Sequence, residues 1–166
     1  MGRSIPIFVA AGILSLGTFY FKSEHSYDMH LVIPVGIYFI TAYLLAFKPA
    51  VALKNKLIFS AISLLVWLVL FGASYNLFFF VAAPLSGGIG AWLIILLSKK
   101  YLNIDIQKKW PVIIIGLAAA VLGLAFMVLV KKGASIGIKA GIMVALWQIG
   151  VGIFTFKEHD KLAASE

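Results

Sequence analysis

The hydrophobic positions of this chain are gathered in six long apolar runs, separated by short polar segments. The runs cover residues 5–21, 31–47, 57–73, 77–97, 110–130 and 136–156. A helix that crosses a bilayer needs about 20 apolar residues, within a range of about 17 to 25. The pattern therefore predicts an all-α fold: an integral membrane helical bundle of six transmembrane helices, forming a single domain over residues 1–166.

The shortest division is between the third and fourth runs, where only Ser74-Tyr75-Asn76 interrupts the apolar sequence. A single helix over residues 57–97 would be about twice as long as a bilayer is thick. We therefore expect two helices with a break at this point.

Composition agrees with a lipid environment. Hydrophobic residues make up 63% of the chain and charged residues 12%, with a mean hydropathy of +1.07. The formal net charge is +8, but the basic residues lie in short clusters between apolar runs and form no basic face, so no nucleic-acid partner is predicted.

The basic residues predict an orientation, because Lys and Arg resist translocation across the membrane. One predicted side holds Arg3, Lys48, Lys54, Lys56, Lys99, Lys100, Lys108, Lys109, Lys157 and Lys161, and the other holds Lys22, Lys131, Lys132 and Lys139. We expect a multi-pass protein of the inner (plasma) membrane with both termini in the cytoplasm.

Several chemistries lack their reactive groups. The chain has no cysteine, which excludes thiolate catalysis and cysteine metal sites. No Asp, Glu or His falls within the six runs, so an intramembrane protease, a bis-histidine haem anchor and a carboxylate proton relay are not expected. An enzyme is not favoured, and the sequence indicates no particular cofactor.

Small residues recur at intervals of four in the last predicted helix, at Gly133, Gly137, Gly141 and Ala145. Such ridges let helix backbones approach closely within lipid. Two interpretations stay open: packing within the bundle, or a seam with a second copy or a membrane-complex partner. Gln148 continues this face, and its amide is expected to point toward protein.

The two halves of the chain invite comparison, because three helices per half would allow a 3+3 inverted repeat. Matching residues are Pro6 with Pro84 and Gly12 with Gly90 at an offset of 78, Pro34 with Pro111 at 77, and Trp67 with Trp147 at 80. The alternative is that helices of equal length align by hydropathy alone.

If the repeat is real, the fourth helix, interrupted by Pro84, is the best candidate for lining a substrate site. Ser86, Gly87 and Gly88 would then present backbone groups to a small-molecule ligand. Gln148 and Lys139 are further candidate contacts, although they lie on different faces of the last helix. The alternative is a simple proline kink.

The segment between the first two helices gathers Glu24, His25, Asp28 and His30, which are metal-ligand types. A site there would need a loop conformation, and the alternative is a solvated loop. Three function classes follow: a solute transporter, channel or membrane substrate-capture protein; a non-catalytic membrane subunit of a larger complex; and a membrane enzyme with an extracytoplasmic metal in this loop.

Overall fold

The computed structural model describes residues 4–22, 32–76, 79–129 and 136–163, and these residues form six α-helices and no strand. The helices are α1 (Ser4–Lys22), α2 (Val32–Phe47), α3 (Leu53–Asn76), α4 (Phe79–Leu102), α5 (Lys109–Leu129) and α6 (Ile136–Ala163). The prediction of an all-α chain with six helices is confirmed.

Three helices extend by three or more residues beyond the apolar runs that predicted them. α3 begins at Leu53, α4 ends at Leu102 and α6 ends at Ala163, because the Lys, Glu and Leu residues that flank the runs are good helix formers. α2 and α4 are followed by left-handed residues, Lys48 with φ of 44° and Asn103 with φ of 55°. Such residues close a helix end by satisfying its last carbonyl groups.

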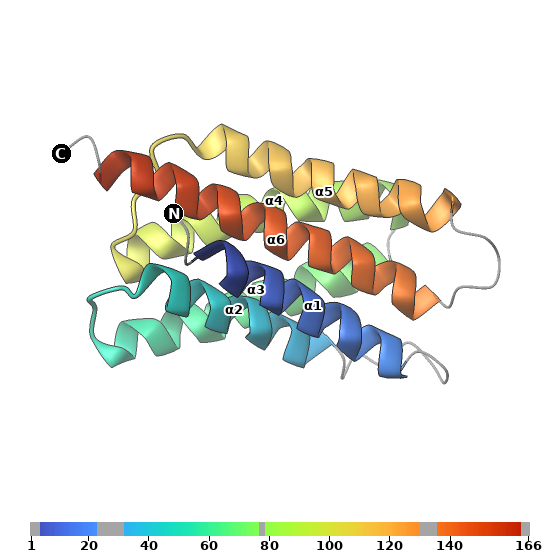
Figure 1. Cartoon of the computed structure of the whole chain (residues 1–166), viewed down its shortest axis with the longest axis horizontal. Coiled ribbons are helices and arrows are strands. Elements are labelled where there is room, and N and C mark those ends of the chain that lie inside the picture. Colours follow the sequence, from blue (N-terminus) through green and yellow to red (C-terminus); the bar gives the residue numbers. More distant parts are fainter. Residues whose placement is uncertain (1–3, 23–31, 77–78, 130–135, 164–166) are drawn as a thin grey trace.

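The six helices form a ring. Each helix packs against the next along the chain, and α6 closes the ring by packing against α1 (Figure 1). α6 is the most central helix, since it also contacts α2 and α4. α3 is more peripheral than α6: 11% of residues 53–70 of α3 are buried, against 56% of residues 139–162 of α6.

This cyclic order does not match the arrangement that the possible 3+3 inverted repeat would need. The repeat needs a two-fold axis perpendicular to the bundle that exchanges α1 with α4, α2 with α5 and α3 with α6. Seen along the bundle, such a rotation turns a clockwise order of helices into an anticlockwise one. Replacing α1, α2 and α3 by α4, α5 and α6 keeps the order clockwise, so the ring cannot have this symmetry. The contact of α2 with α6 also has no comparable counterpart between α5 and α3 among the described residues. Alignment of similar apolar helices explains the matching positions instead.

Glycines lie where helices approach most closely. A Cβ atom added at Gly87 of α4 would lie 2.5 Å from the carbonyl oxygen of Gly116 in α5. A Cβ atom added at Gly141 of α6 would lie 2.8 Å from the Cβ atom of Phe19 in α1. The small-residue ridge of α6 therefore packs against α1 at Gly141, and the carbonyl of Ala145 also faces α1, 3.3 Å from where a Cβ atom would stand at Gly12.

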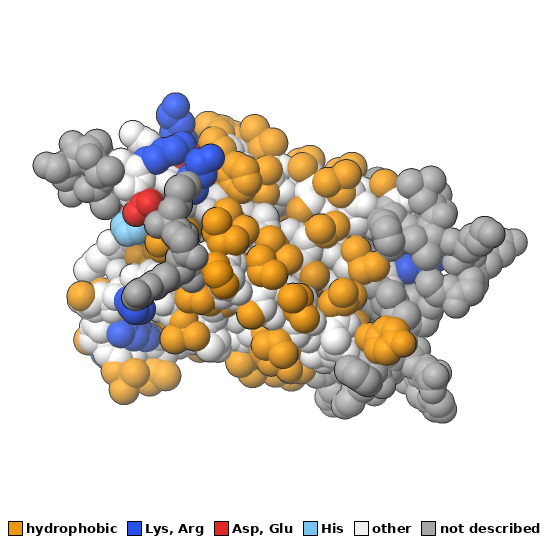
Figure 2. Space-filling view, viewed as in Figure 1, with side chains coloured by type: hydrophobic (Ala, Val, Ile, Leu, Met, Phe, Trp, Pro, Cys, Tyr) orange, Lys and Arg blue, Asp and Glu red, His pale blue; other side chains and the backbone are white. Residues whose placement is uncertain are grey.

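Large apolar side chains are exposed on every helix. They include Ile13 and Leu14 of α1, Leu45 of α2, Leu57 and Leu65 of α3, Leu85 and Ile89 of α4, Ile114 and Leu122 of α5, and Leu146 of α6. Figure 2 shows such side chains across the middle of one face, whereas charged side chains gather mainly at the end where α1 begins and α6 ends.

Two helices of the described chain are long and apolar enough to cross a membrane, over Leu53–Leu70 and Lys139–Leu162. Ser4–Tyr20, Ile33–Phe47 and Lys109–Ala125 are apolar but shorter. Since one or two such helices also occur in the cores of soluble proteins, the membrane location stays a prediction at this point.

Gly87→Ala should lower the free energy of unfolding by about 1–3 kcal/mol, the usual cost of adding a methyl group where there is no space. The obstructing atom belongs to the backbone of α5, so the two helices must separate. Thermal unfolding followed by the helical circular dichroism signal measures the loss. Gly17→Ala in α1 is the control, because its added Cβ meets nothing within 4 Å. Equal midpoints for the two variants would contradict the close α4–α5 contact.

Candidate functional site

A small cavity lies between α2, α3, α4 and α6, near the middle of each helix. Its volume is about 20 Å³, which is room for one water molecule. Its wall includes Phe39, Ser63, Trp67, Gly90, Ile94 and Trp147. Ser63 is 2% exposed and its Oγ has no hydrogen-bond partner. An unpartnered buried hydroxyl is unfavourable, so a molecule that reached it would gain a hydrogen bond, although other atoms cover the Oγ in this arrangement.

Two tryptophans meet beside this cavity. The rings of Trp67 in α3 and Trp147 in α6 have centroids 5.5 Å apart. The Nε1–H group of Trp147 donates a hydrogen bond to the carbonyl of Gly87 in α4 at 2.9 Å. Trp147 is thereby tied to a second helix, whereas Trp67 is carried by the peripheral helix α3.

Glycines make room for both indoles. A Cβ atom at Gly36 of α2 would lie 2.9 Å from Cδ1 of Trp67, and one at Gly90 of α4 would lie 3.2 Å from Cζ2 of Trp147. A larger residue at either position would press on an indole ring. The size of the cavity is therefore set by the indole rings of α3 and α6, which lie against the glycines of α2 and α4.

Gln148 connects three helices through its side-chain amide. It is fully buried, its Oε1 accepts a hydrogen bond from Ser15 of α1 at 2.8 Å, and its Nε2 donates to the carbonyl of Val35 in α2 at 2.9 Å. Both ends of the amide are thus engaged by protein. This arrangement holds α6 in register with α1 and α2.

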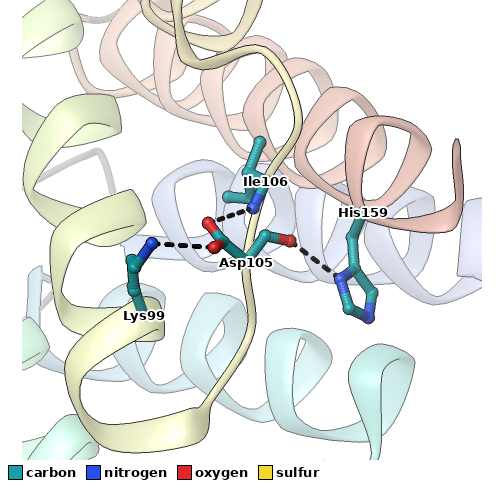
Figure 3. A network of polar contacts seen from close by, with 4 residues as sticks. All are labelled: Lys99, Asp105, Ile106 and His159. Atoms are coloured by element: carbon teal, nitrogen blue, oxygen red, sulfur yellow. Dashed lines mark hydrogen bonds and ion pairs between the residues drawn. The ribbon is translucent and has the colours of Figure 1, made fainter. Parts of the chain in front are cut away.

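A second polar cluster lies at the end of the bundle where α4 and α6 end (Figure 3). Lys99 and Asp105 form a salt bridge at 2.7 Å, and the Nδ1 atom of His159 lies 2.9 Å from the Asp105 carbonyl oxygen, at hydrogen-bond distance. Ile104 and Ile106, on either side of Asp105, are each 3% exposed. The segment between α4 and α5 therefore inserts two isoleucines into the bundle end and keeps its carboxylate outside.

Glu158 of α6 extends this cluster. Its side chain is 4% exposed, its Oε1 accepts a hydrogen bond from Lys161 at 2.5 Å, and its Oε2 has no partner. Its backbone carbonyl accepts a hydrogen bond from the N–H of Gln107 at 3.4 Å. The end of α6 is in this way attached to the same segment that holds Asp105.

The charge of Asp105 is stabilised by its surroundings. The hydrogen bond from the Lys99 ammonium, followed by one from the backbone N–H of Ile106, holds the pKa of Asp105 below its ordinary value. Both donors favour the ionised carboxylate.

The substrate residues predicted from the sequence do not meet in one place. Gly87 packs on Gly116 and Gly88 lies against Leu117, so both face α5 rather than the cavity. Ser86 is half-buried one residue earlier in α4. The same helix reaches the cavity instead through Gly90 and Ile94. Lys139 lies in the first turn of α6, more than two turns from Gln148. A ligand role for these residues stays a prediction.

The predicted metal residues, Glu24, His25, Asp28 and His30, lie outside the described residues, as does Gly133 of the small-residue ridge. Gly137 lies in the first turn of α6. Within the part of the chain that the structure describes, no three His, Cys, Asp or Glu side chains are grouped to hold a metal ion.

The sequence did not single out Ser63 or Gly36. Trp67, Trp147 and Gly90 did attract notice, as positions matched between the two halves, although the structure gives them a different meaning: they meet in one cavity. The sequence signal for this cavity is a glycine that faces each tryptophan: Gly36 faces Trp67, and Gly90 faces Trp147.

Comparison with known proteins gives no assignment: the chain matches no protein family, and no curated protein or solved structure shows significant similarity to it.

Gln148→Leu should lower the free energy of unfolding by about 1–3 kcal/mol, because the buried Ser15 hydroxyl and the Val35 carbonyl each lose a partner. Thermal unfolding measures the change. Ser15→Ala is the matched variant, since it breaks one of the two bonds and should cost less. If Gln148→Leu were as stable as the unaltered protein, the amide would not hold the three helices together.

Asp105→Asn should reduce stability near neutral pH by less than about 1 kcal/mol, because the salt-bridged side chains are 57% and 48% exposed. A carboxyl whose folded pKa is lowered stabilises the fold above its unfolded pKa of about 3.9, and the contribution is lost as the pH falls through the folded pKa. Denaturant unfolding curves of the two proteins should therefore converge in acid.

Lys99→Met provides the control for this experiment. Because it removes the same interaction, adding Asp105→Asn to it should have little further effect. A stability difference between Asp105→Asn and the unaltered protein that stays constant down to acid pH would contradict the assignment.

Proposed function

We propose that the chain is a multi-pass membrane protein whose six helices each cross the bilayer once, and whose core takes up a small solute for transport or capture. The exposed apolar side chains on every helix support the membrane location, because soluble proteins rarely expose such continuous apolar surface. The lipid bilayer is then the main partner of the outer surface.

Helix lengths and charge support the same proposal. α1, α3, α4 and α5 contain 19 to 24 residues, or about 28–36 Å at 1.5 Å per residue, which matches a hydrocarbon core of about 30 Å. α2, with 16 residues, is shorter, and local thinning of the bilayer accommodates such a helix. The lysine-rich end, where α1 begins and α6 ends, is assigned to the cytoplasm.

The observation that carries the solute proposal is the cavity at Ser63. It combines an unpartnered buried hydroxyl with an otherwise apolar wall, at the middle of the bundle. Carrier sites are typically found at this depth. The cavity has room for only about one water molecule, so a larger solute requires one wall to move.

α3 is the wall best suited to move. A much smaller share of its residues is buried than in α6, and its neighbours in the ring are α2 and α4. It supplies Ser63 and Trp67 to the cavity, so its displacement would open the site directly. Helices with few buried contacts are the ones that open at low free-energy cost.

The other two function classes have less support. A subunit that docks through the small-residue ridge of α6 would have to displace α1, which already covers Gly141. A membrane enzyme would depend on Glu24, His25, Asp28 and His30, which lie outside the described residues.

The proposal is tested by tying α3 to α4. The chain has no cysteine, and a Cβ atom at Gly90 would lie 3.4 Å from Cδ1 of Leu70, so Gly90→Cys with Leu70→Cys can be joined by a short bis-methanethiosulfonate. Reconstituted vesicles should reswell in glycerol at least several-fold faster than empty vesicles. Both residues line the cavity, so the cross-link fills the cavity as well as holding α3 to α4. Either effect should remove this excess, and reduction to the free thiols should restore it.

The control ties two helices that are not expected to move. A Cβ atom at Gly88 would lie 3.6 Å from the Cβ atom of Leu117, which suits a direct disulfide between α4 and α5. Gly88→Cys with Leu117→Cys should keep the glycerol flux when oxidised. Equal flux through the bundle with α3 tied and with α3 free would count against the proposal.

A further inference from the structure

We infer that the central cavity is a binding site for a small, uncharged solute that carries a hydroxyl or similar hydrogen-bonding group on an apolar body, and that Ser63 recognises this group. The inference deepens the proposed function by naming the solute class. Binding itself is measured separately from transport.

The wall of the cavity excludes charged solutes. None of the residues that line it is ionisable. The carboxylates of Asp105 and Glu158, which pair with lysines, lie away from it at the lysine-rich end of the bundle. An ion taken from water into such a wall would find no countercharge, at a cost far above that of a neutral molecule.

The aromatic rings do not reverse this conclusion. Phe39, Trp67 and Trp147 surround part of the cavity, with ring centroids 5.2 Å apart for Phe39 and Trp147. Aromatic faces attract cations, but these rings pack on one another at tilted angles. The three packed rings therefore give the cavity an apolar wall, which favours the apolar part of a solute.

The single hydroxyl of Ser63 sets the polar requirement. Its Oγ can donate one hydrogen bond and accept others, and no protein group takes part in any. Its neighbour one turn earlier shows the ordinary alternative: the Oγ of Ser60 donates to the Lys56 carbonyl of its own helix at 2.8 Å. Among the described serines of α3, Ser63 is therefore the one whose hydroxyl has no protein partner, and a ligand reaches its covered Oγ once α3 moves.

The size limit follows from the two glycines. Gly36 and Gly90 already give the indoles the smallest possible neighbour, so further space requires larger wall residues to move, and α3 contributes two of these, Trp67 and Leu70. A solute of a few heavy atoms needs the smallest such movement. Short-chain alcohols have the required size, polarity and charge.

The test uses the two cavity tryptophans as the reporter. Trp92 and Trp110 are 45% and 73% exposed, and Trp92→Phe with Trp110→Phe leaves only Trp67 and Trp147 to emit. The protein is purified in detergent and titrated with 1-propanol, and with propylammonium as its charged isostere. The indole emission should change saturably with 1-propanol. The half-saturating concentration of 1-propanol should be at least tenfold lower than that of propylammonium.

Ser63→Ala should raise the half-saturating concentration of 1-propanol about tenfold, the equivalent of one hydrogen bond of about 1.4 kcal/mol. Ser60→Ala is the matched control on the same helix and should leave it unchanged. Equal 1-propanol binding by Ser63→Ala and the unaltered protein would overturn the role of Ser63. Equal binding of 1-propanol and propylammonium, or no saturable signal, would overturn the solute class even if Ser63→Ala did not fold.

The outcome is independent of the flux experiment. Saturable binding that depends on Ser63, without glycerol flux in vesicles, would leave this site standing and reject transport. Flux that is abolished by tying α3, without any alcohol binding, would support the proposed function and reject the site.

Discussion

The close approach of α6 to the helices around it is the constraint on which the rest of the bundle depends. α6 touches α1 through Gly141 and Gly152, and the contact with Phe8 at Gly152 leaves no space for a side chain. In the lipid environment proposed for this chain, apolar side chains gain little by leaving the solvent, so such contacts and hydrogen bonds between helices would provide much of the stability. α6 can therefore lie at the centre and complete the ring.

Hydrogen bonds from uncharged side chains then fix the rotation of the central helix. Gln148 binds α1 and α2, Trp147 binds α4, and the hydroxyl of Tyr43 pairs with Ser98 between α2 and α4 at 2.7 Å. None of these interactions requires a buried charge, which would be costly in an apolar core. These hydrogen bonds fix how the helices are rotated, and among the described residues they leave one buried hydroxyl, that of Ser63, without a protein partner.

Much of the helical content could be predicted from the sequence, because apolar runs of this length are a local signal. That the Gln148 amide points toward protein followed from its place on a glycine ridge. The ring order could not be predicted, since it depends on contacts between residues more than 100 positions apart. Ser63 was missed for a similar reason: in the sequence it resembles Ser60, and only the positions of four helices show which hydroxyl lacks a partner.

The ring has a consequence for connectivity. α1 and α6 are neighbours, and the start of α1 and the end of α6 lie at the same end of the molecule (Figure 1). A short linker between them would make the backbone a closed circle in which every helix still precedes its spatial neighbour. New termini opened between α2 and α3, at the same end, would then yield a circular permutant that retains all the neighbouring helix pairs. In such a chain the closing contact would fall between different helices, while α1 and α6 would become a local hairpin.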